Sequence, residues 1–188
     1  NDYVGKSLSG GKIIIKTSSK SNLVSCENVI IGNTVLYGAT AGKLYASGQA
    51  GERFAVRNSG SLAIVEGCGA HGCEYMTGGS VIILGLVGDN FGAGMTGGMA
   101  FIYDCKNNFE NFANPVSIIW QKVETEYWKK FLKNNLEDFL KETDSKTAKK
   151  ILDNYENEIQ NFKQVCPIEM LDKLDNPITL KNLVKKVS

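Results

Sequence analysis

The sequence is poor in several residue types, and each shortage excludes a class of protein. Its 188 residues include one histidine, three prolines and two arginines, and the net charge is +1. So small a charge creates no strong field that would attract a nucleic acid. No apolar run approaches the length of a membrane-spanning helix, and the first residues carry no signal-peptide pattern. We therefore expect a cytoplasmic protein with neither nucleic acid nor membrane as a partner.

The cysteines are too irregularly spaced to form a disulfide framework. Their number is odd, and a chain of this length buries enough apolar surface to fold without covalent cross-links. We expect all of them to be reduced, as in a cytosolic protein. They are Cys26, Cys68, Cys73, Cys105 and Cys166.

Glycine is absent from the second half of the chain, and this absence divides the sequence in two. All 20 glycines lie between Gly5 and Gly98. Residues 105–188 carry most of the charge, with 14 of the 21 basic and 13 of the 20 acidic side chains. The composition predicts a glycine-rich domain over residues 1–104 and a separate C-terminal tail over residues 105–188.

Short apolar runs follow glycines at a regular interval within the first part. The runs that begin at Gly42, Gly60, Gly79 and Gly98 start 18, 19 and 19 residues apart. They are short and rich in β-branched and aromatic residues, which is typical of buried strands. Units this small bury their apolar side only by stacking on one another, about 4.8 Å apart. The repeat predicts a mainly β fold, a parallel β-helix with glycines at its corners.

The tail has the pattern of amphipathic helices. Apolar residues recur at spacings of three and four from Trp128 to Leu140, and again from Ala148 to Phe162. Ser145 or Asp144 is suited to cap the second helix, and we expect Pro167 to end it. The aromatic stripe is best explained by packing against the β-helix or a neighbouring domain.

One glycine cluster matches a dinucleotide-binding motif letter for letter. Gly92, Gly94 and Gly97 fit G-x-G-x-x-G, but a Rossmann unit needs a helix after this loop, and MAFIY reads as a strand. A second match, GCGAHG at residues 67–72, is also followed by a strand-like run. We interpret both as corners of stacked coils and expect no cofactor-binding residue in this chain.

Two further patterns could carry chemistry. Cys68, His71 and Cys73 lie within six residues, but no partner at a recognised spacing supplies a fourth zinc ligand. His71 is also the only histidine available to activate a cysteine, and their closeness in sequence does not ensure contact. We expect neither a metal site nor a catalytic residue here.

The two arginines lie together in GERFAVRNSG, near several acidic residues. Arg53 and Arg57 accompany 19 lysines, and Glu66 and Glu74 follow about one coil later. The planar guanidinium group suits fixed, bidentate pairing with carboxylates. These four residues are our candidates for structural ion pairs or a domain interface, with ligand binding as the alternative.

Residues 51–104, from GERFAVRNSG to GGMAFIYD, closely resemble the C-terminal GXGXG domain of the glutamate synthase large subunit. The upstream segment NDYVGKSLSGGKI fits the same pattern, and TAKKIL with FKQVCP resembles the helical tail that closes that subunit. The resemblance covers nearly the whole chain. This sequence departs from the family at Ala70, where an acidic residue usually precedes the histidine.

The resemblance implies a right-handed β-helix and a parent enzyme of ammonia assimilation. That enzyme makes two glutamates from glutamine and 2-oxoglutarate, using FMN, an iron–sulfur cluster and a reductant. The resemblance also implies that the GXGXG domain holds none of these sites. Its implied role is a non-catalytic scaffold that bridges the amidotransferase and FMN-binding domains of the same polypeptide, with a small reductase subunit or ferredoxin as a further partner.

Family domains of this kind have further coils before the position of Asn1. Since Asn1 also stands where an initiator methionine would, we expect a fragment of a longer polypeptide whose first coil exposes an unpaired edge. Two alternatives to the scaffold remain open. One is a free-standing β-helix assembly subunit, as in formylmethanofuran dehydrogenase-like complexes. The other, disfavoured by the strand after Gly98, is a nucleotide-binding oxidoreductase domain.

Overall fold

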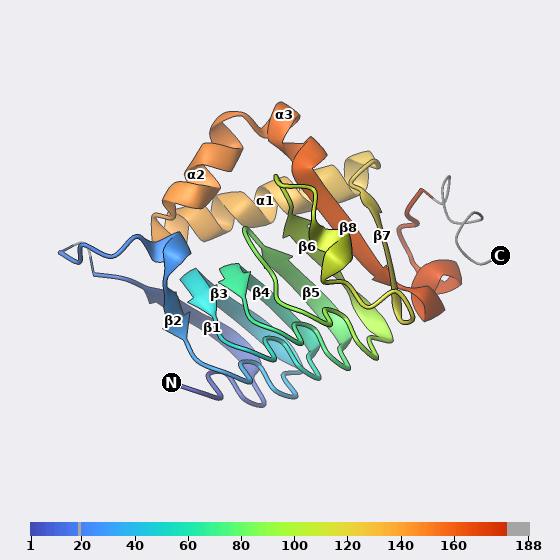
Figure 1. Cartoon of the computed structure of the whole chain (residues 1–188), viewed down its shortest axis with the longest axis horizontal. Coiled ribbons are helices and arrows are strands. Elements are labelled where there is room, and N and C mark those ends of the chain that lie inside the picture. Colours follow the sequence, from blue (N-terminus) through green and yellow to red (C-terminus); the bar gives the residue numbers. More distant parts are fainter. Residues whose placement is uncertain (19, 180–188) are drawn as a thin grey trace.

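The computed structural model describes residues 1–18 and 20–179, which form a mainly β solenoid with helices packed along one side (Figure 1). The predicted stack of parallel coils is confirmed. Five parallel strands lie side by side in the order β1-β3-β4-β5-β6 and form what we call the strand wall. Their bounds are Ser9–Lys16 (β1), Ala41–Ala50 (β3), Ser59–Cys68 (β4), Thr77–Ile83 (β5) and Gly97–Tyr103 (β6), and the short β2, Val29–Ile31, pairs with β3.

A second segment of each coil forms a wall of turns opposite the strands. Within each of these segments, every second residue has a positive φ, giving three left-handed positions per coil. The turns occupy residues 3–7, 34–38, 53–57, 71–75 and 90–94, which we call the turn wall. The predicted glycine corners are therefore present at Gly92 and Gly94, but most left-handed positions hold other residues.

Hydrogen bonds between coils satisfy the backbone of the turn wall. The N–H of Arg53 donates to Ala70 O of the next coil at 2.8 Å, and that of Ala55 donates to Val35 O of the preceding coil at 2.9 Å. The left-handed residues thus let the N–H groups point alternately to both neighbours. This arrangement pairs buried backbone groups that would otherwise be unsatisfied.

The core of the solenoid lies between the two walls. Alternate strand residues such as Ala63 and Val65 point inward, and they meet Leu36, Ala55 and Cys73 from the middle of the turns. These three left-handed residues are fully buried. Burial of their side chains offsets the strain of the backbone.

Glycine at the start of a strand is required where coils stack closely. A Cβ atom on Gly60 would lie 2.0 Å from Thr40 O, and one on Gly97 would lie 2.0 Å from Thr77 O. Gly10 occupies the same place in the first coil, where a Cβ would meet nothing within 4 Å. The recurring glycines therefore reflect the approach of one backbone to the next.

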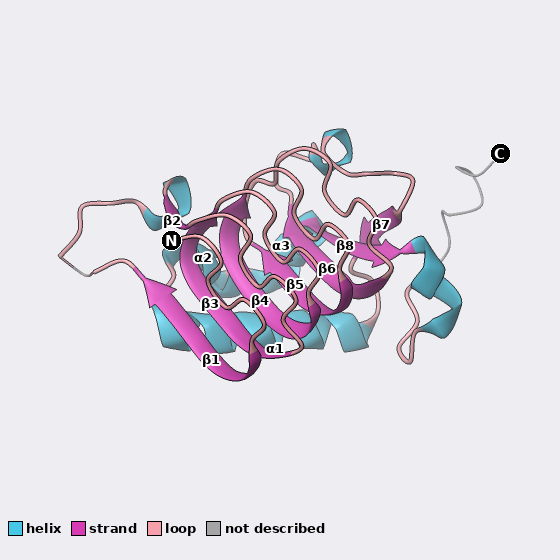
Figure 2. Cartoon of the chain, turned by 90° about the horizontal axis from the view of Figure 1, so that it is seen from below, coloured by secondary structure: helices cyan, strands magenta, loops and turns pink. Residues whose placement is uncertain are grey.

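The helices cover the outer face of the strand wall (Figures 1 and 2). Outward residues such as Tyr45, Ile64 and Phe101 pack in one cluster with Leu132 and Phe139, which confirms that the aromatic stripe packs against the β-helix. The helices are α1 (Glu126–Thr143), α2 (Lys146–Asp153) and α3 (Tyr155–Glu158), with 3-10 turns at Ser25–Glu27, Phe109–Asn111, Ile159–Asn161 and Ile168–Lys173. No helix among the described residues is long and apolar enough to cross a membrane.

The second helical stripe ends earlier than the sequence predicts. Phe162–Pro167 is a strand, β8, which pairs antiparallel with β6, and Ile118–Lys122 forms β7 on its far side. The prediction of helix up to Phe162 was wrong because the open edge of β6 offers backbone partners that helical periodicity does not register. Pro167 therefore ends a strand, and β8 and β7 close this end of the sheet.

A buried carboxyl group attaches α2 to the strand wall. Ser145 caps α2 by accepting a hydrogen bond from Ala148 N at 3.0 Å, as predicted, and its hydroxyl donates to Glu66 Oε1. Glu66 is 2% exposed, and among the described residues its Oε2 has no hydrogen-bond partner. Burial raises the pKa of Glu66, while hydroxyl groups, chiefly that of Ser145, act to lower it.

The solenoid is open at its first coil. Within the described residues β1 pairs with β3 on one side only, and Val4, Leu8, Ile13 and Ile15 are only partly buried against the core. An edge of this kind exposes both backbone hydrogen-bonding groups and apolar side chains.

Stacking predicts that Gly60→Ala destabilises the fold by roughly 1–3 kcal/mol, because the added methyl group meets a backbone oxygen that cannot move alone. Gly10→Ala is the matched control and should change the free energy of unfolding by less than about 0.5 kcal/mol. Chemical denaturation of both variants measures this. Equal losses at the two sites would contradict the stacking explanation.

Glu66 should make the fold less stable as the pH rises. Its folded pKa lies above the unfolded value, so its contribution is fully present below the unfolded pKa and is lost as the pH rises through the folded pKa. The difference in unfolding free energy between the native chain and Glu66→Gln should therefore fall as the pH rises above the ordinary pKa of glutamate, about 4.3. Taking this difference cancels the titration of other groups. A difference that stays constant with pH would contradict a raised pKa of Glu66 in the folded protein.

The open edge predicts self-association of the isolated chain. Light scattering should show dimers or larger species whose fraction grows with concentration. Ile15→Lys, which places a charge at the open end of the core, should shift the population towards monomer. A monodisperse monomer of the native chain at all concentrations would contradict the prediction.

Candidate functional site

The turn wall brings two of the predicted site residues into contact. Arg53 and Glu74 lie on neighbouring coils, with Arg53 Nη2 2.9 Å from Glu74 Oε2. The geometry is that of an ion pair without an aligned hydrogen bond, since Glu74 Oε2 has no hydrogen-bond partner among the described residues. The Glu74 side chain is 12% exposed and that of Arg53 is 52% exposed. The pair thus joins two coils at the protein surface.

Polar side chains continue from Glu74 along the turns. His71 Nδ1 lies 3.6 Å from Glu74 Oε1 and 3.3 Å from Asn90 Nδ2, and Asn114 Nδ2 donates to Asn90 Oδ1 at 2.8 Å. We call these residues, with Arg53, the polar ladder. If Asn90 donates to Nδ1, the ring proton of His71 lies on Nε2. Sequence reasoning missed Asn90, although it follows His71 by 19 residues, the period of the repeat.

The other two predicted site residues lie apart from this ion pair. Arg57 is exposed, its backbone N–H donates to Glu74 O at 3.0 Å, and its guanidinium group has no partner among the described residues. Glu66 lies on the outer face of the strand wall, bonded to Ser145. The structure therefore pairs Arg53 with Glu74 and leaves Arg57 free at the surface.

The cysteines beside His71 are buried in the solenoid core. Burial raises the pKa of Cys68 to about 12 and raises that of Cys73 well above its ordinary value. Both thiols are thus held in the protonated form, which is a poor nucleophile and a poor metal ligand. Within residues 1–18 and 20–179, no group of three or more histidine, cysteine and acidic side chains could hold a metal ion.

The amide groups of the G-x-G-x-x-G segment are already engaged. Gly92 N donates to Gly72 O at 2.8 Å, and Gly94 N donates to Ser117 Oγ at 2.9 Å. Gly97 begins β6, so the motif leads into a strand. A phosphate-binding loop requires free N–H groups that converge on the ligand. These glycines serve the contacts between coils.

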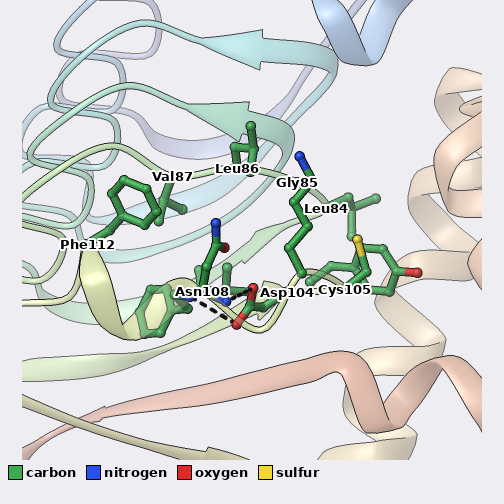
Figure 3. A pocket seen from close by; sticks show the side chains of 12 residues that line it. Leu84, Gly85, Leu86, Val87, Asp104, Cys105, Asn108 and Phe112 are labelled. Carbon is green, nitrogen blue, oxygen red and sulfur yellow. Dashed lines mark hydrogen bonds between the residues drawn. The ribbon is translucent and has the colours of Figure 1, made fainter.

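Two cavities lie away from the polar ladder. A small one of about 140 Å³ lies beside Leu84, Val87 and Phe112, where the Asp104 carboxylate accepts hydrogen bonds from the N–H groups of Asn108 and Phe109 (Figure 3). A larger one of about 850 Å³ lies between residues 16–18 and 21–26 on one side and the junction of α1 and α2 on the other. Glu66 lines the larger cavity. His71, the only histidine of the chain, lines neither.

Comparison with known proteins gives the family. The family model described as "GXGXG motif" matches residues 1–168. The chain is 54% identical to the glutamate synthase [NADPH] large chain of Azospirillum brasilense over 184 residues, which are 98% of this chain and 12% of that protein. It is 52% identical to the corresponding protein of Bacillus subtilis over 169 residues, which are 89% of this chain and 11% of that protein.

A eukaryotic relative extends the similarity to the end of the chain. The glutamate synthase [NADH] of Schizosaccharomyces pombe is 45% identical over 187 residues, which are 100% of this chain and 9% of that protein. The chain thus spans about a tenth of the length of these relatives. With the family model matched over most of its length, the chain belongs to the GXGXG motif family, in which its relatives are glutamate synthase large chains.

Proposed function

We propose that this chain is a structural domain of a glutamate synthase, the enzyme that forms two glutamates from glutamine and 2-oxoglutarate. The observation that carries the proposal is 54% identity over 98% of the chain to a glutamate synthase large chain. The similarity covers the solenoid and the tail together. An unrelated assembly subunit built on a similar solenoid would have no reason to share both.

The proposed role is a scaffold that bridges the amidotransferase and FMN-binding domains of the parent polypeptide. The potentially reactive groups support this role, because Cys68 and Cys73 are buried and His71 is held in the polar ladder. Stacked coils joined by backbone hydrogen bonds form a stiff element. Such an element suits the separation of two active sites at a fixed distance.

Among the described residues, neither the cysteines nor the G-x-G-x-x-G segment fits a cofactor of the parent. An iron–sulfur cluster needs several converging thiolates, and no suitable group exists among the described residues. A glycine loop that binds the phosphate of FMN needs free amide groups, whereas those of Gly92 and Gly94 are bonded within the fold. We assign FMN and the iron–sulfur cluster to other parts of the parent enzyme.

Glutamine-dependent formation of glutamate from 2-oxoglutarate tests the proposal. The longer parent polypeptide, supplied with a reductant, should be active, whereas the 188-residue chain alone should not. Gly60→Ala in the parent should lower the temperature of inactivation but leave kcat at low temperature nearly unchanged, because it weakens stacking without touching substrate. Activity of the chain alone would overturn the scaffold role, and an inactive parent would overturn the assignment to glutamate synthase.

A further inference from the structure

Five exposed side chains on the turn wall occupy backbone positions that side chains normally avoid. They are Tyr3 and Ser7 in the first coil and Arg53, Arg57 and Tyr75 in two adjacent coils further along. Arg53, Arg57 and Tyr75 have φ values of 59°, 54° and 53°. The left-handed conformation is unfavourable for a residue with a Cβ atom, and glycine avoids this cost. Glycine does occupy the place of Arg57 in other coils, at Gly38 and Gly94. The fold therefore accepts glycine at the position that Arg57 and Tyr75 occupy in their coils.

Burial does not explain Arg53, Arg57 or Tyr75. Leu36, Ala55 and Cys73 share the same strained conformation, but they point into the core and are fully buried. Tyr75 is 52% exposed, and the Arg53 and Arg57 side chains are exposed too. Strain at such exposed positions is a recognised mark of functional residues.

Contacts within the chain offset only part of the strain. The ion pair of Arg53 with Glu74 is partly exposed, so water screens it and it stabilises the fold only weakly. The Tyr75 ring lies over Gly94, where a Cβ would be 2.4 Å from a ring carbon. Arg57 has no side-chain partner among the described residues. Of the three residues, Arg57 is thus the one that the fold itself explains least.

The chemistry of the three side chains suits a protein partner. They include both arginines of a chain that otherwise uses lysine for positive charge. Arginine binds carboxylates through two parallel hydrogen bonds, and arginine and tyrosine are enriched among residues that dominate protein interfaces. Arg57 and Tyr75 lie on adjacent coils, as the bond from Arg57 N to Glu74 O shows. The turn wall lies across the strand wall from the helices, which leave it uncovered (Figure 1).

We propose that Arg53, Arg57 and Tyr75 form a docking surface for a carboxylate-bearing segment elsewhere in the parent polypeptide. The Arg57 guanidinium group binds a carboxylate of that segment, and the Tyr75 ring supplies the neighbouring apolar contact. Arg53 is held in place by Glu74. The identity of the partner rests on the proposed function, whereas the surface itself rests on strain, exposure and charge.

Arginine labelling tests whether the surface is covered. A dicarbonyl reagent followed by peptide mass spectrometry reads the two arginines, which are the only ones of this chain, on peptides that are the same in the isolated chain and in the parent polypeptide. Arg57 should react readily in the isolated chain and at least about tenfold more slowly in the longer parent polypeptide. Equal reactivity in both would overturn the docking surface.

Substitution by glycine separates docking from folding. Arg57→Gly should leave the unfolding midpoint of the isolated chain unchanged or raise it, because strain is relieved, yet lower that of the parent polypeptide. Ser7→Gly is the matched control, since Ser7 has a φ of 57° at the same place in the first coil and should act alike in both proteins. Arg57→Lys should fall between Arg57→Gly and the native protein, because it keeps the charge but loses the bidentate geometry.

The outcomes distinguish this inference from the proposed function. A loss of stability in isolated Arg57→Gly would show that Arg57 serves the fold and would overturn the docking surface. If the parent forms glutamate but Arg57 remains reactive in it, only the docking surface fails. If the parent forms no glutamate but protects Arg57, the surface stands and the proposed enzyme is wrong.

Discussion

The spacing between neighbouring coils is the constraint on which the rest of this structure depends. Every coil must offer its backbone groups to the next at about 4.8 Å, on both walls of the solenoid. On the strand wall this distance leaves no room for a Cβ at Gly60 or Gly97. On the turn wall it is met by left-handed residues whose N–H groups alternate between the coils on either side. The glycine content of the first half follows from this spacing.

The same spacing between coils explains why the G-x-G-x-x-G segment lacks the free amide groups of a phosphate-binding loop. A loop that binds phosphate keeps its amide groups free, whereas the amides of Gly92 and Gly94 are bonded to the preceding coil and to Ser117. Since the backbone of the turn wall is occupied by the stack, only its outward side chains can interact with another molecule. This restriction directs attention to Arg53, Arg57 and Tyr75 rather than to the glycines.

The strands were predictable because a glycine recurs at the start of most of them. Glycine is needed there because the backbones of neighbouring coils approach closely. The left-handed positions of Arg53, Arg57 and His71 were not, because no side-chain property distinguishes them from ordinary turn residues. The strand β8 was missed since Phe162 continues the helical spacing of Ile159, and only the free edge of β6 decides between the two structures. The sequence placed Arg53 and Glu74 among the candidates for ion pairs, and the structure pairs them. The sequence could not show that Glu66 faces α2 on the other side of the strand wall.

The helix α1 gives the solenoid a cooperativity that stacked coils alone would lack. Coils that contact only their neighbours can open independently from either end. Across the strand wall, α1 contacts β6 through Trp128 and Phe101, and β3 through Phe139 and Tyr45, with ring centroids 5.8 and 5.6 Å apart. Near its end it reaches β1 through the ion pair of Glu142 with Lys12. Opening one coil must therefore disturb a helix held by several others, and this contact couples the coils of the stack to one another.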